Sequence, residues 1–197
     1  MYLVIPACKN FYLSLRQSLN ILQPQLRTDD KVIVVNLGMT KKQMEFLKSR
    51  NYKAIDISRI DGLSIKNNWK KDLQNYWFKS AIWSGLLNRK IKDIVLVIDS
   101  ACIIYNNIST IETLINKNII YSPYSDADIK KWVHPKSQES IGFTLPDNLH
   151  MVSGGCLGVN LDHPVGNAFI EDFIKCCNNK DTLCPNGSNK SNHRQDQ

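Results

Sequence analysis

Short continuous runs of apolar residues alternate along the first half of the chain with segments in which apolar residues recur at helical spacing. The runs predict strands at 2–5, 31–35, 53–57 and 94–99. Helical spacing predicts helices at 11–22, in the segment that Thr40 would cap, and at 70–87. Strands of continuous apolar character that alternate with helices are typical of a mostly parallel sheet covered on both faces.

The second half of the chain is less regular. Residues 119–121 continue the strand pattern, 122–148 mix proline, serine and aspartate without a period, and 168–177 predict a helix. Between them, the apolar run 151–161 contains Gly154 and Gly155, and glycine within a strand pattern indicates a bulge or a close approach of backbone to a ligand. The fold class expected is α/β, with one domain over 1–197 and helices on both faces of a mostly parallel central sheet.

Polar residues follow three of the predicted strands. Asn10, Asn36 and Asp99 each come just after a strand, and parallel strands present their carboxyl ends at one edge, where ligands bind in such folds. Burial of an unpaired carboxylate is costly. Asp99 is therefore either at the mouth of a cleft or the first residue of a surface turn.

Composition adds limits on partners and compartment. The net charge is +7, but the cations are mostly scattered lysines without an arginine-rich block, so a polyanionic ligand is compatible and nucleic acid is not expected. No run approaches the roughly 18 apolar residues of a membrane span, and the start of the chain lacks the basic segment of a signal peptide. The spacing of the six cysteines fits neither a disulfide framework nor a metal site, which favours thiols in a reducing, cytoplasmic compartment.

Four stretches in order carry a resemblance to a known family. They are ACKNFYLSLRQSL, VIVVNLGMTKKQMEFLK, NYWFKSAIWSGLL followed by IVLVIDSA, and SGGCLGVNL with the later CPNG…HRQDQ. Together they resemble the glycosyltransferases of the GT-A fold, a nucleotide-diphospho-sugar transferase family, and in the second half its glycogenin and galactosyltransferase type. The resemblance spans nearly the whole chain.

The resemblance implies transfer of a sugar from a nucleotide-diphosphate donor to an unknown glycan, protein or small-molecule acceptor. By position, it assigns donor binding to Pro6, Ala7, Asn10, Asn36, Lys79, Asp99, Ser100, Ala101, Gly154, Gly155, His193 and Arg194. It assigns catalysis to Asp196 and Gln197, and leaves open whether the reaction retains or inverts the anomeric configuration. In the family, a divalent cation, Mn²⁺ or Mg²⁺, is held by an Asp-x-Asp motif. Asp99 matches the first position, but the third is Ala101, so metal dependence stays open.

Several of these residues have structural alternatives. Lys79 is either a partner of Asp99 or of diphosphate, or a surface lysine, and the glycine pair is alternatively a β-bulge. The literal Asp126-Ala127-Asp128 is interpreted as a solvated loop pair in preference to a second metal site, and His134 as a surface histidine.

Two other functions remain to be weighed. A catalytically inactive GT-A-like module that binds sugar or nucleotide would account for Ala101 and for a chain that ends inside the His-Arg-x-Asp-Gln motif, as a fragment or truncated product would. A nucleotidyltransferase is disfavoured, because no glycine-rich phosphate loop follows the first strand.

Overall fold

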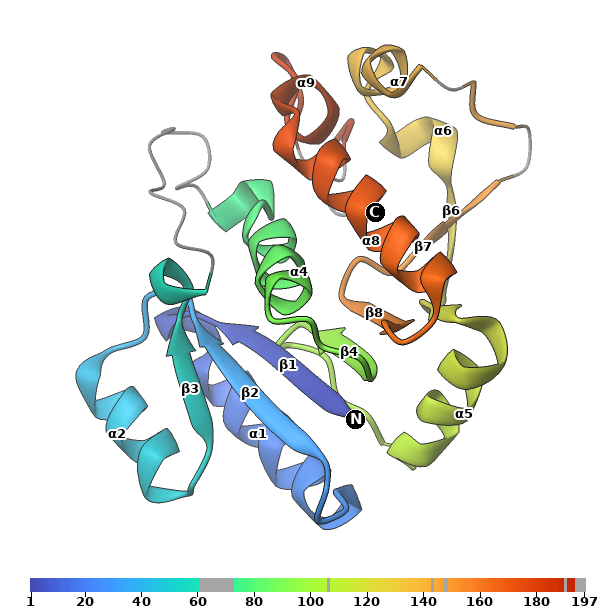
Figure 1. Ribbon diagram of the computed structural model, residues 1–197. Coiled ribbons are helices and arrows are strands. Elements are labelled where there is room, and N and C mark those ends of the chain that lie inside the picture. The colour runs from blue at the N-terminus through green and yellow to red at the C-terminus, as the bar shows by residue number, and fades with distance from the viewer. Residues whose placement is uncertain (61–72, 106, 143, 147–148, 190, 194–197) are drawn as a thin grey trace.

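A six-stranded sheet with strand order β3-β2-β1-β4-β8-β5 forms the centre of the molecule. The computed structural model describes residues 1–60, 73–105, 107–142, 144–146, 149–189 and 191–193 (Figure 1). The strands of this sheet are β1 Tyr2–Ala7, β2 Lys31–Asn36, β3 Lys53–Asp56, β4 Ile94–Ile98, β5 Ile120–Tyr121 and β8 Cys156–Asn160. Strands β1 to β4 pair in parallel, and β8 runs antiparallel to both β4 and β5. The predicted mostly parallel sheet is confirmed.

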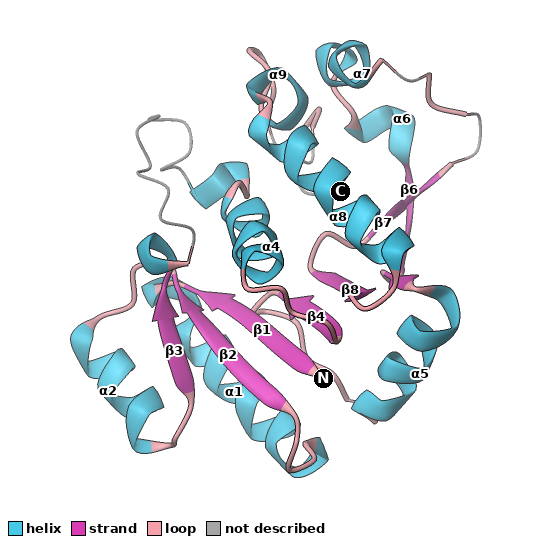
Figure 2. Ribbon diagram, in the orientation of Figure 1, coloured by secondary structure: helices cyan, strands magenta, loops and turns pink. Residues whose placement is uncertain are grey.

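Helices cover both faces of this sheet, because successive strand residues point to opposite sides. Leu3 and Ile5 of β1 pack with helices α1 Tyr12–Leu22, α2 Lys41–Ser49 and α5 Ile108–Asn118. Val4 packs on the other face, with α4 Phe78–Asn88 and α8 Pro164–Asn178 (Figure 2). Thr40 caps α2 as predicted, with a reciprocal hydrogen bond from its backbone to Gln43.

A second, smaller layer stands beside the sheet. It contains a two-stranded antiparallel sheet of β6 Tyr124–Asp128 and β7 His150–Val152, and the short helices α6 Ile129–Trp132, α7 Pro135–Ile141 and α9 Lys180–Leu183. The expectation of an irregular 122–148 is therefore wrong for much of that range. Asp128 and His134 begin α6 and α7 by accepting hydrogen bonds from backbone N–H groups two residues on. These caps stabilise helices too short to show a period.

Three other predicted boundaries differ from the structure. The helix expected at 70–87 begins only at Phe78, because Leu73–Asn75 forms a 3₁₀ turn and Tyr76 has a φ of 56°, which no α-helix accommodates; residues 70–72 lie outside the described residues. Pro6 and Ala7, which lie beyond the strand predicted at 2–5, continue β1. Gly154 and Gly155 form a turn between β7 and β8, and not a bulge within one strand.

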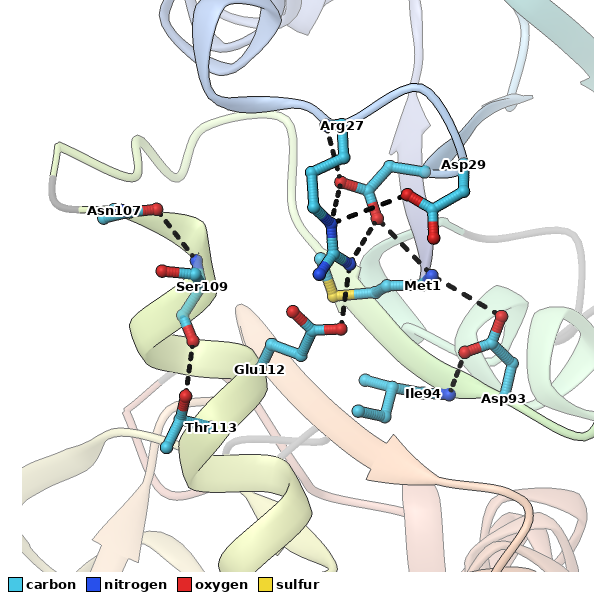
Figure 3. Close-up of polar contacts among 10 residues, drawn as sticks. Met1, Arg27, Asp29, Asp93, Ile94, Asn107, Ser109, Glu112 and Thr113 are labelled. Carbon is cyan, nitrogen blue, oxygen red and sulfur yellow. Dashed lines mark hydrogen bonds and ion pairs between the residues drawn. The ribbon is translucent and has the colours of Figure 1, made fainter.

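An ion network joins the amino ends of the strands (Figure 3). The Met1 amino group lies 3.4 Å from Asp30 and 3.5 Å from Asp93, which precede β2 and β4. Arg27 donates to Asp30 and to Glu112 of α5, both at 2.9 Å. The network thus ties the amino ends of β1, β2 and β4 to helix α5, at the edge of the sheet opposite the carboxyl ends.

Candidate functional site

The carboxyl ends of four parallel strands meet at one edge of the sheet. Ala7 pairs with Asn36, Asn36 pairs with Asp56, and Asp99 directly follows β4 on the other side of β1 (Figure 2). The strand-end placement predicted for Asn36 and Asp99 is what the topology produces. Asp56, which ends β3, lies at the same edge and is not among the predicted site residues.

A buried lysine from α4 meets the carboxylate at the end of β4. The Lys79 ammonium lies 3.2 Å from Oδ2 of Asp99, and it also donates to the carbonyl of Gly154. It stands 5.1 Å from the ring centroid of Tyr76, within the range of a cation–π contact. Lys79 is 5% exposed, so the surface-lysine alternative is wrong, whereas the Asp99 side chain is 29% exposed. Asp99 is thus the member of the pair that a ligand can reach.

The Gly154–Gly155 turn packs directly against the end of β4. The Asp99 N–H donates to the Gly155 carbonyl at 2.8 Å, and the Cys102 thiol donates to the same carbonyl at 3.3 Å. A Cβ atom on Gly155 would lie 2.9 Å from the Cys102 sulfur and 3.5 Å from Oδ2 of Asp99. Glycine is therefore required by the close approach of this turn to the residues that follow β4.

The two thiols beside Asp99 are held in the protonated form. Burial is the main cause that raises the pKa of Cys102, and the Asp99 carboxylate raises it further. Burial, followed by Cys102 and Asp99, raises the pKa of Cys156 to about 12. A nucleophilic or metal-binding role requires the thiolate, so these cysteines act here as neutral packing groups.

The asparagines predicted for donor binding have different surroundings. Asn36 accepts hydrogen bonds from the backbone N–H groups of Gly38 and Met39, and donates to Asp56 at 3.2 Å. Its side chain therefore builds the loop after β2. A hydrogen bond from the Ser58 hydroxyl is the main cause that lowers the pKa of Asp56.

Asn10, by contrast, is exposed in the 3₁₀ turn Lys9–Phe11 after β1. Pro6 and Ala7 are buried in β1, so that only their backbone borders the edge. Ser100 is also buried, its carbonyl accepting a hydrogen bond from Ser18, and Ala101 is exposed beside Asp99.

His193 is buried among the short helices of the second layer. Its Nδ1 accepts from the backbone N–H of His134 at 3.2 Å, so Nε2 carries the proton and donates to the Leu183 carbonyl at 3.0 Å. Burial is the main cause that lowers the pKa of His193 below its ordinary value. His134, expected at the surface, is half-buried and caps α7. The remaining tail residues predicted for the site, Arg194, Asp196 and Gln197, lie outside the described residues.

A cavity of about 250 Å³ lies between the Lys79–Gly154 contact and His193. Lys79 and Gly154 line it on the side of Asp99, and His193 lines it on the side of the short helices. The central sheet and the second layer thus enclose one space, whose wall includes the partner of the strand-end carboxylate.

The described residues do not fit a divalent cation held by the protein alone. They contain no group of three or more His, Cys, Asp or Glu side chains close enough to share a metal ion. Asp99, the predicted ligand, is paired with an ammonium group. The Asp126-Ala127-Asp128 stretch, expected as a loop, belongs to β6, and Asp128 caps α6. The cation remains a prediction to which the described residues add a single carboxylate.

The arrangement defines a GT-A-like glycosyltransferase fold, as the resemblance predicted. The galactosyltransferase LgtC, in complex with donor and acceptor sugar analogs, superimposes with a TM-score of 0.53 and 15% identity, over 93% of this chain and 69% of LgtC. The UDP complex of glucosyl-3-phosphoglycerate synthase from Mycobacterium tuberculosis gives 0.52 and 15%, over 82% of this chain and 56% of that one. The bifunctional glycosyltransferase WbbM gives 0.59 and 11%, over 89% and 34%.

At these identities the likeness concerns the fold. No family model matches the sequence, and no curated protein matches it. None of the helices within the described ranges has the length and apolar character needed to cross a bilayer.

Proposed function

We propose that this protein is a glycosyltransferase that moves a sugar from a nucleoside-diphosphate donor to a hydroxyl group of an acceptor. The observation that carries the proposal is the accessible carboxylate of Asp99 at the end of β4, held by buried Lys79 against the Gly154–Gly155 turn. The fold that places it there is shared with a galactosyltransferase solved with donor and acceptor analogs and with a synthase solved with UDP.

Asp99 and Lys79 have different parts in this proposal. The carboxylate of Asp99 is exposed enough to accept hydrogen bonds from hydroxyl groups of the donor sugar. A carboxylate that binds such hydroxyl groups discriminates strongly against sugars that lack them. Lys79 is a positioning residue: its ammonium fixes the carboxylate and the Gly154 carbonyl relative to each other. The backbone of the glycine turn then borders the donor sugar, as the resemblance implies.

The chemical step is displacement at the anomeric carbon through an oxocarbenium-like transition state. We assign catalysis to Asp196 and Gln197 and phosphate contact to Arg194. In an inverting reaction Asp196 would take the proton from the acceptor hydroxyl. The burial of His193 in the cavity wall that also includes Lys79 supports this assignment, because it directs the chain just before these residues to the site.

The roles proposed for Asp99, Lys79 and Asp196 do not depend on a divalent cation, because the described residues offer one only the Asp99 carboxylate, which is paired with Lys79. Manganese or magnesium would supply charge neutralisation of the leaving diphosphate if bound. We place the reaction in the cytoplasm, since none of the six cysteines, all of which are described, is in a disulfide.

The proposal is tested by calorimetry and nucleotide release with a panel of UDP- and GDP-sugars. We expect one donor to bind and to release its nucleotide. Asp99→Ala should lower the affinity for that donor by about tenfold or more, the loss expected on removal of a charged hydrogen-bonding partner. Asp172→Ala is the matched control, since Asp172 is an exposed carboxylate on α8. Asp196→Asn should suppress transfer while donor affinity stays near that of the wild type.

Two results would contradict the proposal in different ways. If no donor of the panel gives heat, the site is not a nucleotide-sugar site. Donor binding without nucleotide release, with or without added Mn²⁺, would indicate the inactive binding module instead.

A further inference from the structure

The cavity beside Lys79 has an apolar interior. It lies between the central sheet and the second layer, and it is lined by α4, β4, β8 and α8 together with residues of β7, α7 and α9. Its principal apolar side chains are Trp83 of α4, Val97 of β4, Leu157 of β8, and Phe169 and Phe173 of α8. We call this space the apolar cavity.

One group of polar atoms in its wall belongs to the Asp99 site. The Lys79 ammonium donates to the Gly154 carbonyl and pairs with Asp99, and the Ser122 hydroxyl donates to the Ser153 carbonyl at 2.9 Å. Lys79, Ser122, Ser153 and Gly154 all line the apolar cavity. Through Lys79, its polar side is therefore next to the carboxylate proposed to bind the donor.

The polar groups on the side of the short helices are satisfied within the protein. Both ring nitrogens of His193 are hydrogen-bonded to backbone, and the Ser137 hydroxyl donates to the Asp181 carbonyl at 3.3 Å. Burial raises the pKa of Cys176, which keeps that thiol neutral. This side therefore presents to a ligand a surface with little demand for hydrogen bonds.

The apolar cavity has an accessible mouth. Ile141, Val152 and Phe169 line it and are nevertheless 49%, 41% and 36% exposed. Exposed apolar side chains that gather at the rim of a hollow are typical of a ligand-binding site, whereas single ones scattered over a surface need no explanation.

We propose, on the basis of the proposed function, that the apolar cavity binds the non-sugar body of the acceptor, an alcohol whose hydroxyl group points toward Lys79 and Asp99. An apolar cavity of about 150 Å³ stays dry and holds benzene. By that scale the present volume accommodates an apolar group of roughly ten non-hydrogen atoms. The acceptor class is thus an aryl- or alkyl-substituted alcohol. An oligosaccharide fits less well, because its hydroxyl groups would lie against the apolar side chains of the cavity.

The experiment uses 4-phenyl-1-butanol and 1-octanol as aryl and alkyl probes, with 1,4-butanediol as a polar comparison, in ligand-observed NMR titrations of the full chain. We expect at least one apolar probe to bind about tenfold or more tighter than the diol. Cys176→Trp fills the cavity from α8 and should lower the affinity for that probe by about tenfold or more. Ala168→Trp, on the exposed side of the same helix, is the matched control and should leave binding unchanged.

Ile141→Trp provides a second variant at the mouth, where the exposed position tolerates a larger side chain in the folded protein. It should weaken the same probe, and thermal unfolding of all three variants checks that they are folded. Equal affinities in Cys176→Trp, Ile141→Trp and Ala168→Trp, or equal binding of the diol and the apolar probes, would overturn the inference.

A transfer assay separates this inference from the proposed function. With the donor found in the panel, the bound apolar alcohol should be glycosylated, and Cys176→Trp should reduce that transfer but not donor binding. Turnover of donor onto the diol and the apolar alcohols at equal rates would overturn the acceptor assignment and leave the glycosyltransferase proposal standing. Probe binding without nucleotide release from any donor would overturn both the proposed function and the acceptor role.

Discussion

Gly155 and Cys102 meet where the turn between β7 and β8 crosses the end of β4. Gly155→Ala would place a methyl group 2.9 Å from the Cys102 sulfur, closer than packed atoms tolerate. We expect a loss of about 1–3 kcal/mol in the free energy of unfolding, as for other overpacked sites. Cys102→Ala removes the obstructing atom, so a double-mutant cycle in denaturant should show a favourable coupling of at least about 0.5 kcal/mol. Strictly additive effects would mean that the turn moves away freely.

Asp30 should make stability depend on pH in the acid range. Burial raises the pKa of its carboxyl, but the hydrogen bonds from the Arg27 side chain and backbone outweigh this and hold the pKa below its ordinary value of 3.8. A lowered pKa stabilises the folded state above 3.8, and this contribution disappears as the pH falls through the folded-state pKa. Asp30→Asn should therefore cost about 1–3 kcal/mol at pH 7 in denaturant unfolding, and the difference from wild type should shrink toward pH 2.

The control for this measurement is the neighbouring Asp29, which is 74% exposed and 3.6 Å from the same guanidinium. An exposed ion pair contributes little, so Asp29→Asn should be nearly neutral at every pH. Equal effects of the two substitutions would show that the burial of Asp30 does not increase its contribution to the free energy of unfolding.

The residues of the site differ in how far the sequence predicts them. Asp99 is predictable because it ends a continuous apolar run in a parallel pattern. The burial of Lys79 is not predictable, because Asp99 and Gly154, which its ammonium group contacts, are distant from it in the sequence. Asp56 lies at the same edge as Asp99, but its strand β3 is short and less apolar, so the sequence gives a weaker signal for it.

At the scale of elements, the pattern of apolar residues predicts a strand or a helix only when the element is long enough to show a continuous apolar run or a helical period. The strands β1, β2 and β4 and the helices α1, α2 and α8 follow from such patterns. The helix predicted at 70–87 is wrong for residues 73–77, because Tyr76 adopts a left-handed conformation that no pattern of apolar residues reveals. The sequence does not predict helices α6 and α7, because four and seven residues are too few to establish a period. Their signal is limited to the capping residues Asp128 and His134.

His193 joins three of these short elements and should make their stability sensitive to pH near neutrality. Its neutral ring accepts from His134 and donates to Leu183, and a second ring proton would face the His134 N–H. Because the pKa is lowered in the folded state, mainly by burial, protonation favours unfolding, and stability should fall as the pH drops below about 6.5. Thermal unfolding between pH 8 and pH 5 measures this effect.

His193→Asn should be less stable at pH 8 by about 1–2 kcal/mol, because it loses one backbone hydrogen bond and packing. It should also show a flatter pH profile. His150→Asn, at an exposed position of β7, is the control and should keep the wild-type profile. A His193→Asn profile as steep as that of the wild type would assign the pH dependence to another group.

At the scale of the whole molecule, the two edges of the sheet have separate roles. The ion network of Met1, Arg27, Asp30, Asp93 and Glu112 closes the edge at the amino ends. The opposite edge holds the Asp99 carboxylate, and the second layer covers it on one side with the apolar cavity between. The parallel order of β1 to β4 makes this division necessary, and it is the part of the architecture that the alternating pattern predicts best. The second layer, assembled from short capped elements, is the part that it predicts least.

The ammonium of Lys79 stands beside Asp99, where the resemblance expects a metal ion, and this leads to a prediction about donor binding. Lys79→Met preserves the length of the side chain but removes the charge that holds Asp99 and the Gly154 carbonyl. We expect UDP affinity, measured by calorimetry, to fall by about tenfold or more in this variant, and Lys175→Met, on the exposed face of α8, to be unaffected. Wild-type affinity in EDTA and in Mn²⁺ should differ by less than about threefold, because one paired carboxylate is a poor site for a cation. A gain of about tenfold on addition of Mn²⁺ that Asp99→Asn abolishes would instead place a cation at Asp99, and the positioning role of Lys79 would then have to be judged in the metal-bound protein.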